Sequence, residues 1–118
     1  MPAYCFFDVL EVTDPDKLAK YRQLVFATVE RYGGRYLTVG GRCDVIEGKW
    51  RPAFPVLIEF PSLGQAHDWY DSDEYRDLKT LRLSATRGNA VFINGTCFEM
   101  LGRELQGPPQ RSKDLRQG

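Results

Sequence analysis

Apolar and polar positions follow two different rhythms in the first third of the chain. Ala3–Val12 is rich in aromatic and branched side chains, which predicts a strand. Asp14 and Pro15 then suit the N-cap and the first turn of a helix. Apolar residues recur at helical spacing after that, at Leu18, Tyr21, Val25, Val29 and Tyr32. The glycine pair at 33–34 predicts the end of this helix.

The middle of the chain returns to strand-like patterns. Residues 35–48 form two short strand-like runs separated by Gly40 and Gly41, a pair that indicates a bulge or a sharp bend. Residues 48–55 contain two prolines and are typical of a loop. Residues 56–60 (VLIEF) predict a further strand.

A second helical region follows that strand. Ser62 and Gln65 match a capping box, so we expect a helix to begin at Leu63. The acidic stretch 71–74 interrupts it and starts a new turn, and the helical pattern then continues to Gly88. Residues 90–94 (AVFIN) predict the last strand, and residues 96–101 are a candidate extension of it.

The order of these elements is β-α-β-β-α-β, which predicts a ferredoxin-like subunit of the α+β class. Residues 1–101 form this single domain. Residues 102–118 are dominated by glycine, proline and charge. Such a segment buries too little apolar surface to offset its ordering entropy, so we expect a flexible tail unless a partner chain receives it.

Both faces of the predicted sheet are apolar. Alternate positions of Ala3–Val12 are mostly apolar on either side, and the strands 56–60 and 90–94 behave alike. Two helices cover only one face. If six apolar side chains on the other face stayed exposed, the domain would lose about 9–18 kcal/mol of burial free energy, at roughly 1.5–3 kcal/mol for each side chain. That rivals the stability of a whole domain. We therefore expect a symmetric homodimer that packs sheet against sheet.

Composition narrows the function classes. The 118 residues carry 16 Lys and Arg against 16 Asp and Glu, and this neutral balance argues against nucleic-acid binding. No apolar run has the length of a transmembrane helix, and no basic segment precedes an apolar stretch at the start of the chain. We therefore expect no membrane span, no signal peptide and a cytoplasmic location.

The three cysteines, Cys5, Cys43 and Cys97, are far apart, which predicts reduced, partly buried thiols rather than disulfides or a zinc site. The glycine pairs fit no nucleotide-binding motif, and no metalloprotease or serine-nucleophile motif occurs. We therefore expect no metal and no cofactor.

An ordered set of short motifs resembles the uncharacterised family called domain of unknown function 1330. The motifs are 32–37 (YGGRYL), 40–41 (GG), 45–52 (VIEGKWRP), 58–63 (IEFPSL), 69–72 (WYDS), 74–75 (EY) and Arg82. The resemblance covers roughly residues 3 to 95. It implies a dimeric α+β barrel, in which the sheets of two ferredoxin-like subunits close around each other. Related barrels include cofactor-free monooxygenases, lactone isomerases and polyketide cyclases, which use a pocket between sheet and helices.

His67 is the single histidine of the chain and departs from the family pattern. It lies on or beside the expected buried face of its helix. It is either a general base, since an imidazole titrates near neutral pH, or a solvated or packing residue. Trp50 and Arg51 follow in the loop 48–55. Trp50 either covers a pocket or caps the barrel end, and Arg51 is a candidate for holding a carboxylate.

Arg82 shares a helix face with Tyr75, Leu78 and Ala85, so we expect it to be half-buried. A half-buried guanidinium needs an anion, which is either Glu59 in a structural ion pair or a bound substrate. Tyr21, Tyr70 and Tyr75 face inward by periodicity, either as core residues or with hydroxyls in the same cleft.

The candidate substrate-binding residues are thus Trp50, Arg51, His67, Tyr70 and Arg82. They predict a small cofactor-independent enzyme of the isomerase, cyclase or oxygenase type, acting on a small organic substrate between sheet and helices. The alternative is a non-catalytic small-ligand-binding or assembly module.

Overall fold

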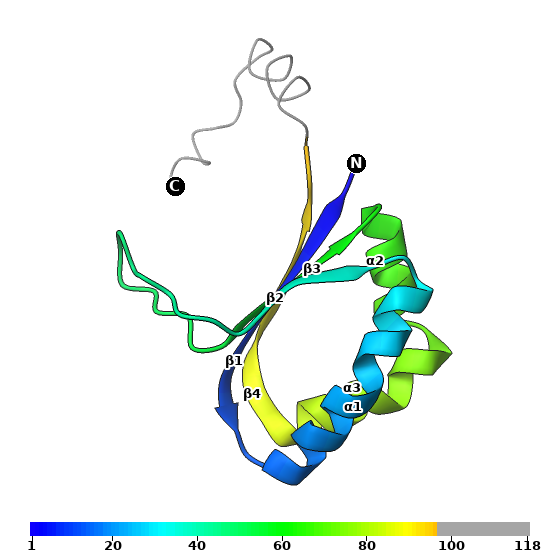
Figure 1. Cartoon of the computed structure of the whole chain (residues 1–118), viewed down its shortest axis with the longest axis horizontal. Coiled ribbons are helices and arrows are strands. Elements are labelled where there is room, and N and C mark those ends of the chain that lie inside the picture. Colours follow the sequence, from blue (N-terminus) through cyan, green and yellow to red (C-terminus); the bar gives the residue numbers. More distant parts are fainter. Residues whose placement is uncertain (97–118) are drawn as a thin grey trace.

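Four strands form one antiparallel sheet in the order β2-β3-β1-β4, and three helices lie on one of its faces (Figure 1). This computed structural model describes residues 1–96. The elements are β1 (Ala3–Val12), α1 (Pro15–Arg31), β2 (Arg35–Val39), β3 (Pro55–Phe60), α2 (Leu63–Tyr70), α3 (Asp73–Ala85) and β4 (Thr86–Asn94). The predicted ferredoxin-like order is confirmed, with α2 and α3 together in the place of the second helix.

The helix starts predicted from the sequence are confirmed by their caps. The Asp14 carboxylate accepts a hydrogen bond from the Lys17 N–H at 3.2 Å, and Pro15 occupies the first turn of α1. The Ser62 hydroxyl accepts from the Gln65 N–H at 3.1 Å. These bonds satisfy backbone donors that a helix leaves free at its start.

The expected second run of strand within 35–48 is wrong. β2 ends at Val39, because Gly40 and Gly41 adopt positive φ angles of 79° and 124° and turn the chain out of the sheet. Residues 40–54 leave the sheet as a long loop on the side away from the helices (Figure 1). The sharp bend expected at these glycines is confirmed, and the pairing of β2 with β3 has a further irregularity between Tyr36 and Thr38.

The boundary between the last helix and the last strand also differs from the prediction. α3 ends at Ala85 rather than near Gly88, and β4 begins at Thr86 rather than at residue 90. The Ala85 carbonyl accepts hydrogen bonds from the N–H groups of Thr13 and Asp14, at 2.7 and 3.2 Å. Helix α3 is thereby fastened to the end of β1, and the chain enters the sheet at once.

The two faces of the sheet have different surroundings. Cys5, Phe7 and Ile58 point toward the helices and are buried in the core. Strand alternation places Phe6, which pairs with Leu57 and Val91, on the opposite face. There Val91 and Ile93 are 52% and 50% exposed. We call this face, which no helix of residues 1–96 covers, the open face.

The cysteines divide between these environments. Cys5 is buried, and this burial raises the pKa of its thiol to about 12. Cys43 lies exposed on the loop, contrary to the expected partial burial. Cys97, most of the candidate strand extension 96–101 and the tail 102–118 lie outside the described residues. Within residues 1–96, no helix is long and apolar enough to span a bilayer.

Candidate functional site

A cleft lies between the helix layer and the sheet, with a cavity volume of about 60 Å³. Helices α1 and α3, three strands and the end of the loop contribute to it. Its lining residues are Phe7, Val9, Leu18, Tyr21, Arg22, Val25, Phe26, Tyr36, Val39, Phe54, Val56, Ile58 and Arg82. We call it the Arg82 cleft. Two of these side chains are cationic and none is a carboxylate, so the cleft is complementary to an anion.

Arg82 reaches the cleft from α3 and is half-buried among aromatic side chains. Its Nε donates to the Tyr75 hydroxyl at 3.2 Å, and its Nη2 donates weakly to the Tyr70 hydroxyl at 3.4 Å. The guanidinium carbon lies 5.1 Å from the centre of the Phe7 ring. Within residues 1–96, no carboxylate lies at ion-pair distance from Arg82.

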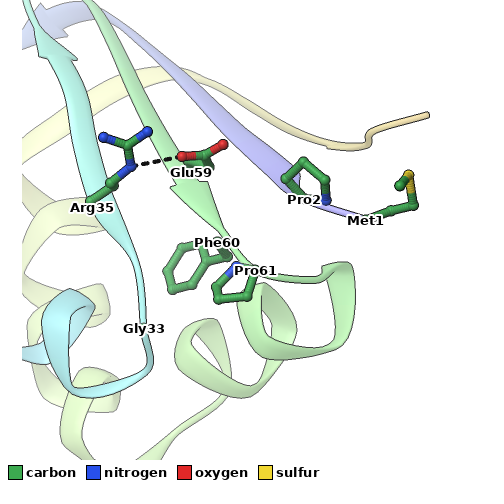
Figure 2. A pocket seen from close by; sticks show the side chains of 7 residues that line it. All are labelled: Met1, Pro2, Gly33, Arg35, Glu59, Phe60 and Pro61. Atoms are coloured by element: carbon green, nitrogen blue, oxygen red, sulfur yellow. Dashed lines mark hydrogen bonds and ion pairs between the residues drawn. The ribbon is translucent and has the colours of Figure 1, made fainter. Parts of the chain in front are cut away.

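The expected pair between Arg82 and Glu59 is therefore wrong. Glu59 lies on β3, where it accepts a hydrogen bond from Arg35 Nε at 2.7 Å. Figure 2 shows the two side chains pointing toward each other across β2 and β3, in a separate pocket that also contains Phe60 and Pro61. Strand alternation explains the difference: the core-facing Ile58 and Phe60 flank Glu59, so its carboxylate points away from the helices.

The tyrosine hydroxyls of the site form a short hydrogen-bonded chain. Those of Tyr21 and Tyr75 lie 2.8 Å apart, so Tyr75 links Tyr21 to Arg82. The inward orientation predicted for Tyr21, Tyr70 and Tyr75 is confirmed. Tyr36 completes the aromatic wall from β2, where no helical periodicity could have revealed it.

Burial decides the charge states here. It raises the pKa of Tyr75 and Tyr36, and that of Tyr21 further with the help of its Tyr75 neighbour. These hydroxyls therefore stay protonated at neutral pH and act as hydrogen-bond partners. Burial alone would lower the pKa of Arg82, but its interactions with Tyr75, Tyr21 and Tyr70 together outweigh burial and raise it. The site holds a permanent positive charge surrounded by neutral hydroxyls.

The remaining predicted residues lie elsewhere. His67 is exposed on α2, with its ring centre 5.2 Å from that of Phe92. Trp50 lies on the open face, edge-on to Phe6 at 5.7 Å, and Arg51 is exposed beside it in the loop. Of the five candidate residues, Tyr70 and Arg82 are joined by a hydrogen bond, and His67 and Tyr70 line a separate hollow beside Phe92.

Arg22 was missed by sequence reasoning and lies at the exposed side of the cleft. Its guanidinium carbon is 5.2 Å from the centre of the Phe54 ring. Its position four residues after Leu18 and three before Val25 was an available signal.

Metal ligands are not gathered in the cleft: across the described part of the chain, no three His, Cys, Asp or Glu side chains cluster as a metal site.

A family model described as a domain of unknown function, DUF1330, matches residues 2–96. Among curated proteins, none matches this sequence. Several solved structures share the fold. A Rhodopseudomonas palustris protein of unknown function has 16% identity and a TM-score of 0.66, with 81% of this chain and 83% of that chain covered.

Two further solved structures have a similar fold. A dimeric ferredoxin-like protein of unknown function from Jannaschia sp. has 9% identity and a TM-score of 0.59, covering 82% of this chain and 100% of that one. A cofactor-independent oxygenase from Streptomyces nogalater has 9% identity and a TM-score of 0.50, covering 81% and 92%. At these identities the likeness shows the fold alone.

Proposed function

The chain belongs to the DUF1330 family, a domain of unknown function, and we propose that it binds a small organic acid in the Arg82 cleft. The observation that carries this proposal is the guanidinium of Arg82, which is half-buried and faces tyrosine hydroxyls with no carboxylate partner within residues 1–96. A cation held out of water is stable only where an opposite charge or strong hydrogen bonds compensate it. A carboxylate on the ligand would supply that charge.

The shape and lining of the cleft define the rest of the ligand. Apart from its two arginines, the cleft is lined by aromatic and aliphatic side chains. A ligand with an apolar body would bury that body against Phe7, Val25 and Ile58. Arg22 adds a second positive charge toward solvent. The cavity volume of about 60 Å³ favours a compact acid over an extended chain.

We infer that the reaction, where one takes place, needs no cofactor and is of the isomerase, cyclase or oxygenase type. Arg82 and the protonated hydroxyls of Tyr21 and Tyr36, which line the cleft, could together stabilise negative charge that develops on a substrate oxygen, as in an enolate. The fold shared with a cofactor-independent oxygenase supports this by analogy only.

A non-catalytic ligand-binding role is the second candidate, and the position of His67 favours it. The imidazole lies exposed on α2, outside the Arg82 cleft, and burial keeps the hydroxyls of the cleft protonated. The cleft residues themselves therefore offer no ready proton acceptor at neutral pH. Turnover of a bound acid that survives His67→Ala and is lost in Arg82→Gln would favour catalysis in the cleft.

Replacement of Arg82 by glutamine is expected to weaken carboxylate binding by roughly 10- to 100-fold, since a hydrogen bond to a charged group contributes about 1.5–3 kcal/mol. Calorimetry with monocarboxylates from propionate to benzoate, and with the matching amides, measures the effect. Arg76→Gln is the matched control, because Arg76 lies on the same helix but pairs with Asp73 at the surface. Equal binding of acids and amides by the native protein would contradict the proposal.

We also propose that two copies pack through their open faces. Val91 and Ile93 are half-exposed there, and strand pairing places them beside Phe6 and Tyr4. Covering these side chains would remove apolar surface from water. The ferredoxin-like protein from Jannaschia, which is described as dimeric, shares the fold, and this supports a dimer here. A cytoplasmic location stays a prediction of the sequence.

The double substitution Val91→Lys with Ile93→Lys is expected to weaken self-association by roughly tenfold or more, because each copy would bury two unpaired ammonium groups in the proposed interface. Sedimentation velocity at micromolar concentration measures the dimer fraction. Leu83→Lys is the control, since Leu83 is 59% exposed on α3 in the helix layer. A native protein that sediments as a monomer would refute the sheet-to-sheet dimer.

A further inference from the structure

Asp8 is a buried carboxylate in an otherwise apolar part of β1. The residue is 2% exposed. Its Oδ1 accepts two hydrogen bonds at 2.9 Å, from the backbone N–H groups of Ala53 and Phe54 at the end of the long loop. Its Oδ2 is also buried, yet it accepts no hydrogen bond from the described residues. One oxygen thus fastens the loop, and the other has no assigned partner.

A hollow of about 260 Å³ lies beside this carboxylate, lined by Phe6, Asp8, Trp50, Asn89, Ala90 and Val91. Strand register places Asp8 opposite Asn89 and Phe6 opposite Val91, on the open face of the sheet. The Arg82 cleft lies across the sheet from it, because Phe7, which lines that cleft, points toward the helices. The two sites are therefore separate.

The unpartnered oxygen has an energetic consequence. A buried acceptor without a hydrogen bond is costly, and more so when it carries charge. Nearly all buried polar groups in native proteins have a partner. Among residues 1–96, no Lys, Arg or His lies within ion-pair distance of Asp8. A positively charged donor would both give Oδ2 a hydrogen bond and compensate the negative charge of the carboxylate.

The walls of the hollow suit a cation that also has an apolar part. Trp50 is 63% exposed and lies edge-on to Phe6 at 5.7 Å. The faces of aromatic rings attract ammonium and guanidinium groups, and Trp does so most strongly. An alkyl chain attached to such a group would pack against Trp50 and Val91. An anion would be repelled by Asp8.

We propose that this hollow binds an organic cation, an alkylammonium or guanidinium group that donates to Asp8 Oδ2 and lies against Trp50. The cation comes either from a free amine or from a basic side chain of a second copy seated on the open face. A second copy would seal the hollow, and the carboxylate would then need this positive charge even more.

The test uses the full chain with n-butylammonium and n-butylguanidinium as probes and n-butanol as the neutral control. Binding is measured by calorimetry and by fluorescence of Trp50, since the second tryptophan, Trp69, is fully buried in the core. Asp8→Asn keeps an acceptor for the Ala53 and Phe54 N–H groups but removes the charge. It is expected to weaken cation binding by roughly tenfold or more. Asp44→Asn, an exposed loop aspartate paired with Arg42, should bind as the native protein does.

The two sources of the cation give different results. Saturable binding of the probes that Asp8→Asn weakens shows a free-amine site. No probe binding by a native dimer, combined with at least tenfold weaker dimerisation of Asp8→Asn, shows that the second copy supplies the cation. If Asp8→Asn changes neither quantity, the proposal is overturned.

A second variant keeps the test decisive if Asp8→Asn releases the loop. Trp50→Ala leaves the carboxylate and its two backbone bonds in place. It must weaken whichever interaction the native protein shows, by roughly threefold or more from the lost aromatic contact. Unchanged affinity in Trp50→Ala would overturn the proposal as well.

Discussion

Replacing Trp69 by alanine is expected to lower the free energy of unfolding by about 3–5 kcal/mol, the usual cost of emptying a large aromatic site in a core. Trp69 lies on α2 and is fully buried. Its ring centre is 4.3 Å from that of Tyr75 and 5.5 Å from that of Phe60. Removing it would leave a cavity where helices α2 and α3 meet the sheet.

The substitution Trp69→Ala would also disturb the residues that hold Arg82 in its cleft. Trp69 packs against both Tyr75 and Tyr70, the two residues whose hydroxyls accept hydrogen bonds from Arg82. Its indole N–H also donates to the Thr28 hydroxyl at 3.0 Å and so joins α2 to α1. The same residue thus supports the core and positions the site.

Urea denaturation followed by circular dichroism measures the effect. Trp69→Phe is the matched variant, because it retains most of the aromatic packing while it loses the bond to Thr28 and part of the ring volume. It is expected to cost about 1–2 kcal/mol, the range for a lost hydrogen bond and a small packing defect. Equal midpoints for Trp69→Ala and the native protein would contradict the assigned core.

Replacing Gly88 by alanine is expected to cost about 3 kcal/mol, at the upper end of the range for overpacking. Gly88 pairs with Val9 where β4 runs along β1. An added methyl group would overlap the backbone carbonyl oxygen of Asp8 and lie 3.1 Å from the Val9 Cα. Backbone atoms cannot rotate away as side chains do, so the strands must separate locally.

Gly64→Ala is the matched control for this substitution. Gly64 lies in the first turn of α2, and an added methyl group there would meet only the Ser62 hydroxyl, at 3.8 Å. Because alanine has a higher helix propensity than glycine, this control is expected to leave the free energy of unfolding unchanged or to raise it by up to about 1 kcal/mol. Equal melting temperatures for Gly88→Ala and Gly64→Ala would show that β4 is not packed as described.

The local elements were largely predictable, because their signals lie close together in the chain. Asp14 with Pro15, and Ser62 with Gln65, mark helix starts through bonds that span three residues. The periodicity of Tyr21 and Tyr75 placed both inside. The wrongly predicted boundary of α3 and β4 lies where two segments that are distant in the sequence meet. Local patterns placed the end of α3 near Gly88. In the structure, the Thr13 N–H donates to the Ala85 carbonyl and the residues after Ala85 pair with β1, so the helix ends earlier.

The candidate site was predictable only in part, for a related reason. The sequence indicated that Arg82 would be half-buried, but Glu59 as its partner required knowing which way β3 turns its side chains. The sequence analysis also expected Trp50, Arg51 and His67 at the same cleft as Arg82. In the structure, none of these three residues lines that cleft. Asp8 offered an unused signal, since a carboxylate in an apolar strand needs partners that distant residues must supply.

By itself, the sequence determined the β-α-β-β-α-β order, the helix caps, the inward tyrosines and a sheet with apolar residues on both faces. Only the tertiary structure decided that Arg82 has tyrosine hydroxyls around it and that Asp8 has an unpartnered oxygen. The physical reason is the range of the interactions. Caps and periodicity depend on neighbours a few residues away, whereas the partners of a buried charge come from whichever strands and helices pack around it.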